Sequence, residues 1–139
     1  TPDLTPEEAG EWFAATDKFG VQRIFLVAPS SKDIRLEIVA NATTGFIYAA
    51  SLMGVTGTRE SVSSHAETLV ARTRKVSDLP IAVGLGVSTP EQAAGIAKYA
   101  DGVIVGSAFV KAVLEAKDHE AALIAVKKLA SELKQGCMK

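Results

Sequence analysis

The sequence predicts an α/β fold in which four parallel strands alternate with helices. Four short apolar runs are separated by segments whose apolar residues recur at helical spacing, which is the pattern of successive β/α units. Two of these runs end in glycine turns, Gly84-Leu85-Gly86 and Gly106-Ser107, and the interval between them accommodates one helix and one strand. Regular alternation of this kind favours a parallel sheet with right-handed crossovers.

The first expected element is a helix that starts in the segment Thr5-Pro6-Glu7-Glu8. Thr5 is predicted as its N-cap and Pro6 as its first residue, and Glu8 would close a capping box. Its buried face is expected to consist of Ala9, Trp12, Phe13 and Thr16. Because such a face needs a packing partner, we expect either a trimmed N-terminus or a strand upstream in a longer parent protein.

Strands and helices then alternate along the chain. Strands are predicted over residues 21–27, 46–50, 81–83 and 102–105. Helices are predicted over residues 32–42, 64–76 and 119–134, with two more that begin at Thr89 and Ser107. Two further capping boxes are expected, Ser64 with Glu67 and Thr89 with Gln92. The side chains expected to point inward are Ile34, Ile38 and Val39, then Ala66, Leu69, Val70 and Thr73, then Ala122, Val126, Leu129 and Leu133.

Four strands cannot close a barrel, because a TIM (β/α)8 barrel needs eight strands and typically about 250 residues. We therefore expect residues 1–139 to form a single partial domain, the C-terminal half-barrel, with strands 5 to 8 and the fourth helix before them. Its edge strands would expose unpaired N–H and C=O groups. We expect such a chain to associate with the complementary N-terminal half-barrel or, if it folds alone, to form a dimer or higher oligomer. The alternative is a loosely packed monomer that binds hydrophobic dyes.

Composition argues against several classes of partner. The chain has 139 residues, 47% hydrophobic and 22% charged, with a formal net charge of −1 and a pI near 6.1. This charge gives no electrostatic basis for binding nucleic acid or an anionic membrane, and the apolar stretches are too short to span a bilayer. Cys137 is the only cysteine, so neither an intramolecular disulfide nor a metal site is expected. A reducing, cytoplasmic location is the default.

The two glycine turns predict an anion site. Each turn removes side chains from the carboxyl end of a strand and leaves backbone N–H groups exposed, where α/β proteins receive anions. In (β/α)8 barrels the loops after the last two strands, with the N-terminus of a short extra helix, commonly hold a substrate phosphate. The alternative is that each glycine serves only its turn.

Four segments carry a family resemblance: residues 2–8 (PDLTPEE), 46–57 (FIYAASLMGVTG), 84–88 (GLGVS) and 101–108 (DGVIVGSA). Together they resemble the C-terminal half of the tryptophan synthase α subunit, essentially from end to end. Gly-Val-Thr-Gly at residues 54–57 is the most discriminating part. The resemblance implies a lyase of tryptophan biosynthesis that cleaves indole-3-glycerol phosphate to indole and glyceraldehyde 3-phosphate without a cofactor of its own. It also implies a partner, the pyridoxal-phosphate β subunit, which receives the indole.

The resemblance further implies roles for individual residues. The substrate phosphate would lie on backbone N–H groups of Gly57, Gly86, Gly106 and Ser107, with the Ser107 hydroxyl adding to the site. The indole pocket would be lined by Tyr48, Leu85 and Ile104, and Thr56 would lie on a loop that closes over the substrate. From pattern alone, the three pocket residues fit ordinary barrel core equally well.

Departures from the family pattern bear on activity. The family's two catalytic carboxylates, a general acid/base Glu and an Asp that polarises the indole nitrogen, belong to the N-terminal half. We therefore expect no catalytic residue in this chain, and no activity from it alone. Leu85 stands where many members carry Phe, and Leu52 where many carry Arg, which changes the expected pocket and loop contacts.

Two other functions fit the residues less well: another phosphate-binding barrel, such as an isomerase or epimerase, and a half-barrel that binds a phosphate ligand or a partner without catalysis. Glu7 and Glu8 are interpreted as helix-cap partners rather than a catalytic pair. His65 and His119 are interpreted as surface residues, because no Ser or Cys nucleophile is placed beside them. Cys137 is interpreted as an unreactive thiol in a polar C-terminal tail.

Overall fold

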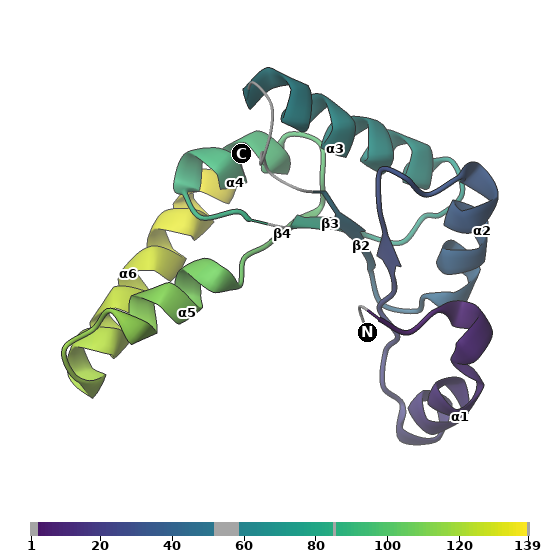
Figure 1. Ribbon diagram of the computed structural model, residues 1–139, viewed down its shortest axis with the longest axis horizontal. Helices are drawn as coiled ribbons and strands as arrows, with labels where there is room; N and C mark the ends of the chain where they lie inside the picture. The colour runs from purple at the N-terminus through teal and green to yellow at the C-terminus, as the bar shows by residue number, and fades with distance from the viewer. Residues whose placement is uncertain (1–2, 52–58, 85, 139) are drawn as a thin grey trace.

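A four-stranded parallel sheet forms the centre of the computed structural model, which describes residues 3–51, 59–84 and 86–138 (Figure 1). The strands lie in chain order across the sheet: β1 (Leu26–Val27), β2 (Ile47–Ala50), β3 (Ile81–Gly84) and β4 (Gly102–Ile104). Tyr48 is opposite both Leu26 and Ala82, and Gly84 is opposite Ile104. The predicted α/β fold with four parallel strands is confirmed.

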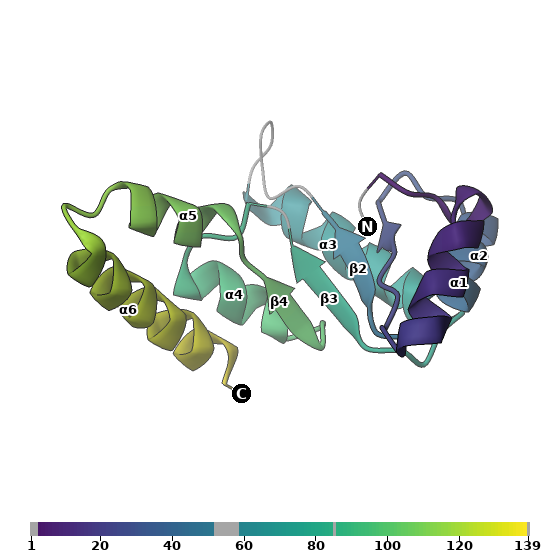
Figure 2. The same cartoon turned by 90° about the horizontal axis from the view of Figure 1, so that it is seen from below.

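Helices precede, connect and follow the strands. They are the 3₁₀ turn η1 (Pro6–Glu8), α1 (Gly10–Phe19), α2 (Asp33–Ala42), α3 (Arg59–Arg74), α4 (Pro90–Ala97), α5 (Ser107–Leu114) and α6 (His119–Cys137). Helices α2, α3 and α4 cover one face of the sheet, whereas α1 lies beyond the β1 edge and α5 and α6 lie beyond the β4 edge (Figures 1 and 2). None of the described helices covers the other face.

Alternation along the strands places the core on the helix-covered side. Ile47 and Ala49 of β2 and Ile81 and Val83 of β3 are fully buried, and they point to one face because successive strand residues alternate. Tyr48 and the other residues between them point to the opposite face and are only partly covered. That second face corresponds to the inside of a (β/α)8 barrel.

The N-terminal segment differs from the prediction. Thr5 Oγ1 donates to Glu8 Oε2 at 2.8 Å, but the Thr5 side chain accepts no bond from a helix N–H, and the α-helix begins only at Gly10. Ala9, Thr16 and partly Phe13 are covered as expected. Trp12, however, is 37% exposed, so its place in the predicted buried face is wrong. A 3₁₀ turn has three residues per turn, fewer than an α-helix. The α-helix that follows it therefore turns a different face to the core than one continuous α-helix from Pro6 would.

Strand β1 is much shorter than the predicted strand over residues 21–27. Val21 is exposed, and the Arg23 carbonyl accepts from two successive N–H groups, those of Thr44 and Gly45, at 3.1 and 3.2 Å. Two donors on one acceptor do not form a regular ladder. Within the described sheet β1 is an edge strand and pairs only with β2. No strand on its other side holds the residues before Leu26 in an extended conformation.

Helix α2 buries a different face from the predicted one. Leu36, Val39 and Ala40 are buried, whereas Ile34 is 62% exposed and Ile38 is 37% exposed. The prediction is right for Val39 and wrong for both isoleucines. The helix carries two apolar stripes, and its contacts with β1 and α3 select the stripe that contains Leu36.

Helix α3 starts earlier than predicted, at Arg59. Ser64 therefore lies inside the helix, and the predicted capping box with Glu67 is wrong. The predicted inward face is confirmed, because the following side chains are all buried: Ala66, Leu69, Val70 and Thr73. The Thr73 hydroxyl is satisfied within the helix, since it donates to the Leu69 carbonyl at 2.8 Å.

The C-terminal helices follow the prediction with one exception. Helix α4 begins at Pro90 behind a capping box, α5 begins at Ser107, and in α6 the predicted face is covered, with Ala122 and Leu133 buried. Cys137 is the exception, because it is the last residue of α6 and packs, partly buried, against the core rather than lying in a tail. No helix among the described residues is long and apolar enough to cross a membrane.

Gly136 lets α6 pack closely against the start of α4, and this contact generates a stability prediction. A Cβ on Gly136 would lie 2.4 Å from the backbone carbonyl oxygen of Pro90, which cannot yield unless α4 moves. We expect Gly136→Ala to lower the free energy of unfolding by about 1–3 kcal/mol, measured by urea denaturation.

Gly95→Ala is the matched control for this substitution. Gly95 lies inside α4, and a Cβ there would meet nothing within 4 Å. The added methyl should raise stability by up to about 1 kcal/mol, because alanine favours the helix more than glycine does. Equal effects of the two substitutions would contradict the close packing of α6 on α4.

Candidate functional site

Two helix N-termini lie at the same edge of the sheet. Helix α4 follows β3, and α5 follows β4. Because β3 and β4 are parallel, their carboxyl ends point the same way. Each N-terminus carries N–H groups without a partner inside its helix, together with the positive end of the helix dipole. Either one could therefore bind an anion, and their side chains decide between them.

The N-terminus of α4 is already satisfied by its own side chains. Gln92 Oε1 accepts from the N–H groups of Ser88 and Thr89 at 2.8 and 3.2 Å, and Thr89 Oγ1 accepts from the Gln92 N–H at 3.3 Å. The pKa of the Glu91 carboxyl is lowered by a hydrogen bond from its own backbone N–H and by one from the Thr89 side chain. A carboxylate thus already occupies the first turn, and it would repel a second anion.

The N-terminus of α5 differs in each of these respects. Its N-cap is Gly106, which has no side chain to accept from the helix, and its first turn contains no acidic residue. A Cβ on Gly106 would meet nothing within 4 Å, so the backbone there is open to approach. Ser107 is exposed and is the first residue of the helix. This end of α5 is therefore the better anion site of the two.

Gly86 holds the turn between β3 and α4. Its φ is 78°, in the left-handed region that glycine adopts without strain. The residue is exposed, and the next side chain, Val87, is buried with 1% of its surface accessible. Gly86 therefore has a conformational role in this turn whether or not its N–H also binds an anion.

Tyr48 and Ile104 converge on Gly84, which lies on the strand between them. A Cβ on Gly84 would lie 2.7 Å from the Ile104 Cβ and 3.1 Å from the Tyr48 hydroxyl oxygen. The missing side chain of Gly84 is thus what leaves room for the other two beside it on the open face of the sheet. The sequence pattern did not indicate this role, since it placed Gly84 in the turn rather than in β3.

Three of the predicted site residues lie outside the described residues: Thr56, Gly57 and Leu85. Leu52 also lies outside them. The structure brings together Tyr48 and Ile104, and it places Gly106 and Ser107 directly after the strand that carries Ile104.

The acidic and histidine residues considered as catalytic candidates form other hydrogen bonds or lie exposed on the surface. The Glu7 carboxylate accepts from Arg35 of α2, and this bond lowers the Glu7 pKa. Glu8 accepts from Thr5, and His65 and His119 are exposed. Within the described ranges, no group of three or more His, Cys, Asp and Glu side chains could hold a metal ion.

Comparisons with known proteins agree with this geometry. The family model described as tryptophan synthase alpha chain matches residues 1–138. The chain is 57% identical to the tryptophan synthase alpha chain of Streptomyces avermitilis, over 97% of this chain and 49% of that protein. It is also 57% identical to that of Thermobifida fusca, over 98% of this chain and 52% of the relative.

Solved structures give the same picture. Tryptophan synthase from Mycobacterium tuberculosis matches with a TM-score of 0.85 at 47% identity, covering 100% of this chain and 49% of the other. The tryptophan synthase α2β2 complex of Pyrococcus furiosus matches with a TM-score of 0.80 at 39% identity, covering 96% of this chain and 53% of the other. The chain thus spans about half the length of the relatives it matches.

The contact between Gly84 and its two neighbours generates a second prediction. In Gly84→Ala the new methyl must displace Ile104, whose carbonyl oxygen would lie only 2.8 Å away, or the Tyr48 ring. We expect a loss of about 1–3 kcal/mol in the free energy of unfolding, together with a change in near-ultraviolet circular dichroism as Tyr48 moves. Gly106→Ala, with open space at its Cβ, is the control and should change neither. Unaltered stability together with an unaltered tyrosine signal in Gly84→Ala would contradict the described packing.

Proposed function

Because this chain belongs to the tryptophan synthase alpha chain family, we propose that it supplies the phosphate-binding half of an enzyme that cleaves indole-3-glycerol phosphate to indole and glyceraldehyde 3-phosphate. The observation that carries this proposal is the N-terminus of α5, which begins at the carboxyl end of β4 behind a glycine and has no acidic residue in its first turn. Family membership also favours this function over that of another phosphate-binding isomerase or epimerase, or of a binding module without catalysis.

The phosphate of the substrate binds at α5 in this proposal. Backbone N–H groups of Gly106 and Ser107 donate to its oxygens, the Ser107 hydroxyl adds a donor, and the helix dipole favours the negative charge. The Gly86 and Gly57 N–H groups complete the site. The capped N-terminus of α4 supports this choice of helix, since Glu91 would repel the phosphate there.

The indole ring binds on the open face of the sheet, against Tyr48 and Ile104. The convergence of these two side chains over Gly84 supports this position, because an apolar wall with one phenolic hydroxyl suits a flat aromatic ring. Leu85 completes the pocket, and Thr56 belongs to the closing loop. With Leu85 in place of the aromatic residue of many relatives, this chain offers the ring an aliphatic contact at that point.

The carbon–carbon bond is cleaved by groups outside this chain. A retro-aldol step needs a general acid/base that gives a proton to the ring carbon of the scissile bond and accepts the proton of a glycerol hydroxyl, and a second group that stabilises the charge on the indole ring. In this proposal both are carboxylates of the N-terminal half. The present chain positions the phosphate and the ring, which holds the scissile bond in a fixed place between them.

Two protein partners follow. The complementary N-terminal half completes the barrel, and the β subunit receives the indole. The related tryptophan synthase of Pyrococcus furiosus is an α2β2 complex, which supports the second partner. No cofactor is needed by the chain itself, because pyridoxal phosphate belongs to the β subunit. The cytoplasmic location stays a prediction from the sequence.

The first functional prediction concerns activity. The isolated chain should release no indole from indole-3-glycerol phosphate, because it lacks both carboxylates, and adding the amino-terminal half of the Streptomyces avermitilis relative should restore cleavage. Spectrophotometric detection of indole measures both. Steady-state release of indole above background by the chain alone would contradict the proposal.

The second functional prediction concerns the phosphate site in the reconstituted enzyme. Gly106→Val should weaken binding of glycerol 3-phosphate in calorimetry by at least tenfold, because its side chain blocks backbone approach, while the open space around Gly106 leaves the fold intact. Ser107→Ala removes one of several donors and should cost only about 1 kcal/mol of binding free energy. Unchanged binding of glycerol 3-phosphate in Gly106→Val would indicate that Gly106 and Ser107 have only a structural role.

A further inference from the structure

A carboxylate at the start of the β3–β4 pair holds the two strands together. Asp101 precedes β4, and Ile81 is the first residue of β3. The Asp101 N–H donates to the Ile81 carbonyl oxygen at 2.9 Å, and Asp101 Oδ2 accepts from the Ile81 N–H, also at 2.9 Å. We infer that this two-point contact fixes the register of β4 on β3 and makes Asp101 a positioning residue for the anion site at the other end of the strands, which rests on the proposed function because that site is the one proposed for the substrate phosphate.

Arg74 of α3 binds the same carboxylate oxygen. Its Nη2 donates to Asp101 Oδ2 at 2.8 Å and to the Tyr99 carbonyl oxygen at 3.4 Å. The Arg74 and Asp101 side chains are 44% and 42% exposed, and exposed ion pairs add little stability. The important contribution of the Asp101 side chain is therefore the acceptor that it offers to the Ile81 N–H, and Arg74 orients that acceptor.

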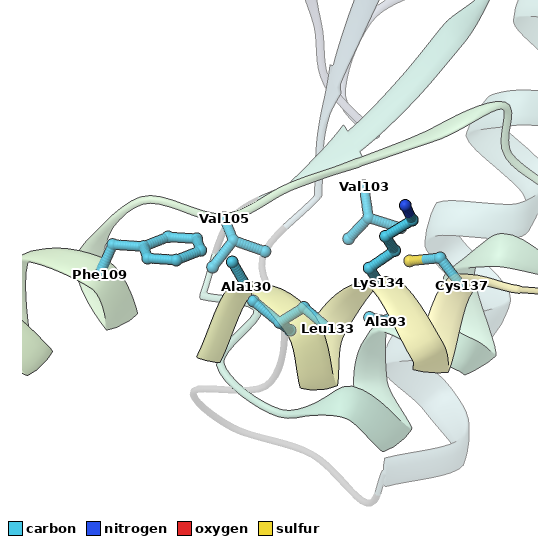
Figure 3. A pocket seen from close by; sticks show the side chains of 8 residues that line it. All are labelled: Ala93, Val103, Val105, Phe109, Ala130, Leu133, Lys134 and Cys137. Carbon is cyan, nitrogen blue, oxygen red and sulfur yellow. The ribbon is translucent and has the colours of Figure 1, made fainter. Parts of the chain in front are cut away.

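Side-chain packing holds β4 less firmly than it holds β2 and β3. No residue of β4 is fully buried. Val103 of β4 and Val105 after it line a cavity of about 290 Å³ in front of α6, rather than a close-packed core (Figure 3). Side chains that border a cavity lack packing contacts on that side, so less packing opposes a slip of this strand. Specific contacts along the β3–β4 pair therefore carry more of the register.

Two glycines favour the same register. A Cβ on Gly102 would lie 3.3 Å from the Cβ of Ala82, its register partner. A Cβ on Gly84 would lie 2.7 Å from the Cβ of Ile104, its partner at the other end of the pair. A slip of two residues is the smallest that keeps every side chain on its own face, and in one direction it would set Ile104 against the Ala82 methyl instead of a glycine.

The register sets the relative position of the two turns at the carboxyl ends. Gly86 lies two residues after Gly84, and Gly106 lies two residues after Ile104, which is the register partner of Gly84. A slip of one residue moves a strand by about 3.3 Å, whereas N–H···O distances vary by only about 0.5 Å. Asp101, about 16 Å from Gly106 at about 3.3 Å per residue, thus helps to decide whether both turns can bind one phosphate.

A second ion pair on α3 provides a matched control. Asp33 accepts from Arg72 Nε at 3.0 Å and from Arg72 Nη2 at 2.7 Å. Like Asp101, it is an aspartate bound to an arginine of α3, but it lies in the first turn of α2 rather than at the start of a strand. Its removal therefore costs a comparable ion pair and leaves the β3–β4 register untouched.

The experiment labels this chain with nitrogen-15 and follows the amide signals of Gly106 and Ser107. Asp101→Ala removes an acceptor from the Ile81 N–H, so it should shift both signals and speed hydrogen exchange at Ile81 by about tenfold or more. Asp101→Asn keeps an acceptor oxygen without the charge, so it should leave both signals near their native positions. Asp33→Ala should change neither the two signals nor the exchange at Ile81.

The position of the affected signals decides between a local role and a positioning role. A change confined to Ile81, with Gly106 and Ser107 at their native signals, would overturn the inference. Equal changes of these two signals in Asp101→Ala and Asp33→Ala would overturn it as well.

Asp101→Glu replaces Asp101→Ala if the alanine variant does not fold. Its longer side chain keeps a charge for Arg74 but displaces the carboxylate from the Ile81 N–H by one methylene. We expect shifted Gly106 and Ser107 signals in Asp101→Glu and native ones in Asp101→Asn. The reverse result would show that the ion pair, not the acceptor for Ile81, holds the strands, and would overturn the inference.

Calorimetry with glycerol 3-phosphate separates this inference from the proposed function. In the complex with the amino-terminal half of the Streptomyces avermitilis relative, Asp101→Ala should weaken binding by about fivefold or more, and Asp101→Asn and Asp33→Ala by less than about twofold. Unchanged binding in Asp101→Ala would overturn the inference. If the unaltered complex does not bind glycerol 3-phosphate, the proposed phosphate site is wrong, and the amide signals still decide whether Asp101 positions the N-terminus of α5.

Discussion

Parallel pairing of the four strands is the constraint on which the functional features of this chain depend. Because all four run the same way, the turns that leave β3 and β4 meet at one edge of the sheet. The register then sets Gly84 directly opposite Ile104, with Tyr48 of β2 reaching toward them. A shift of one residue in either pairing would turn Tyr48 or Ile104 to the helix-covered face and separate the two side chains that the proposed indole site needs on one face.

At that edge, local chemistry separates two helix ends that the backbone makes equivalent. Helix α4 directs Gln92 and Glu91 at its own N–H groups. Helix α5 begins after Gly106, without a side-chain cap and without an acidic residue in its first turn. A helix dipole attracts any nearby anion, so an anion site at one position requires that the neighbouring helix end be neutralised. In the proposed function, the capping box of α4 therefore serves specificity as well as helix stability.

The division of the sheet into a covered and an open face explains how half a barrel keeps a core. Ile47, Ala49, Ile81 and Val83 are buried beneath the helices of this same chain, so the hydrophobic core outside the sheet needs no other chain. The inner face has no such cover in the described residues. The packed core and the residues of the proposed site thus lie on opposite sides of one layer, as in complete barrels.

Sequence alone determined the order and type of the elements, because these depend on local signals. The Thr89 and Gln92 capping box, the start of α5 at Ser107 and the buried face of α3 all follow from short-range periodicity and helix-end chemistry. The sequence Gly106-Ser107 predicted a helix start for the same reason.

Tertiary structure decided what several local signals left open. Helix α2 could bury either Ile34 or Leu36, and contact with β1 and α3 chose Leu36. Cys137 became part of α6 because the helix continues across the core. Gly84 came to lie between Tyr48 and Ile104 only through the register of three strands, which no single segment encodes. The physical reason is common to these cases: each depends on which surface meets which, and that is decided by contacts between residues far apart in the chain.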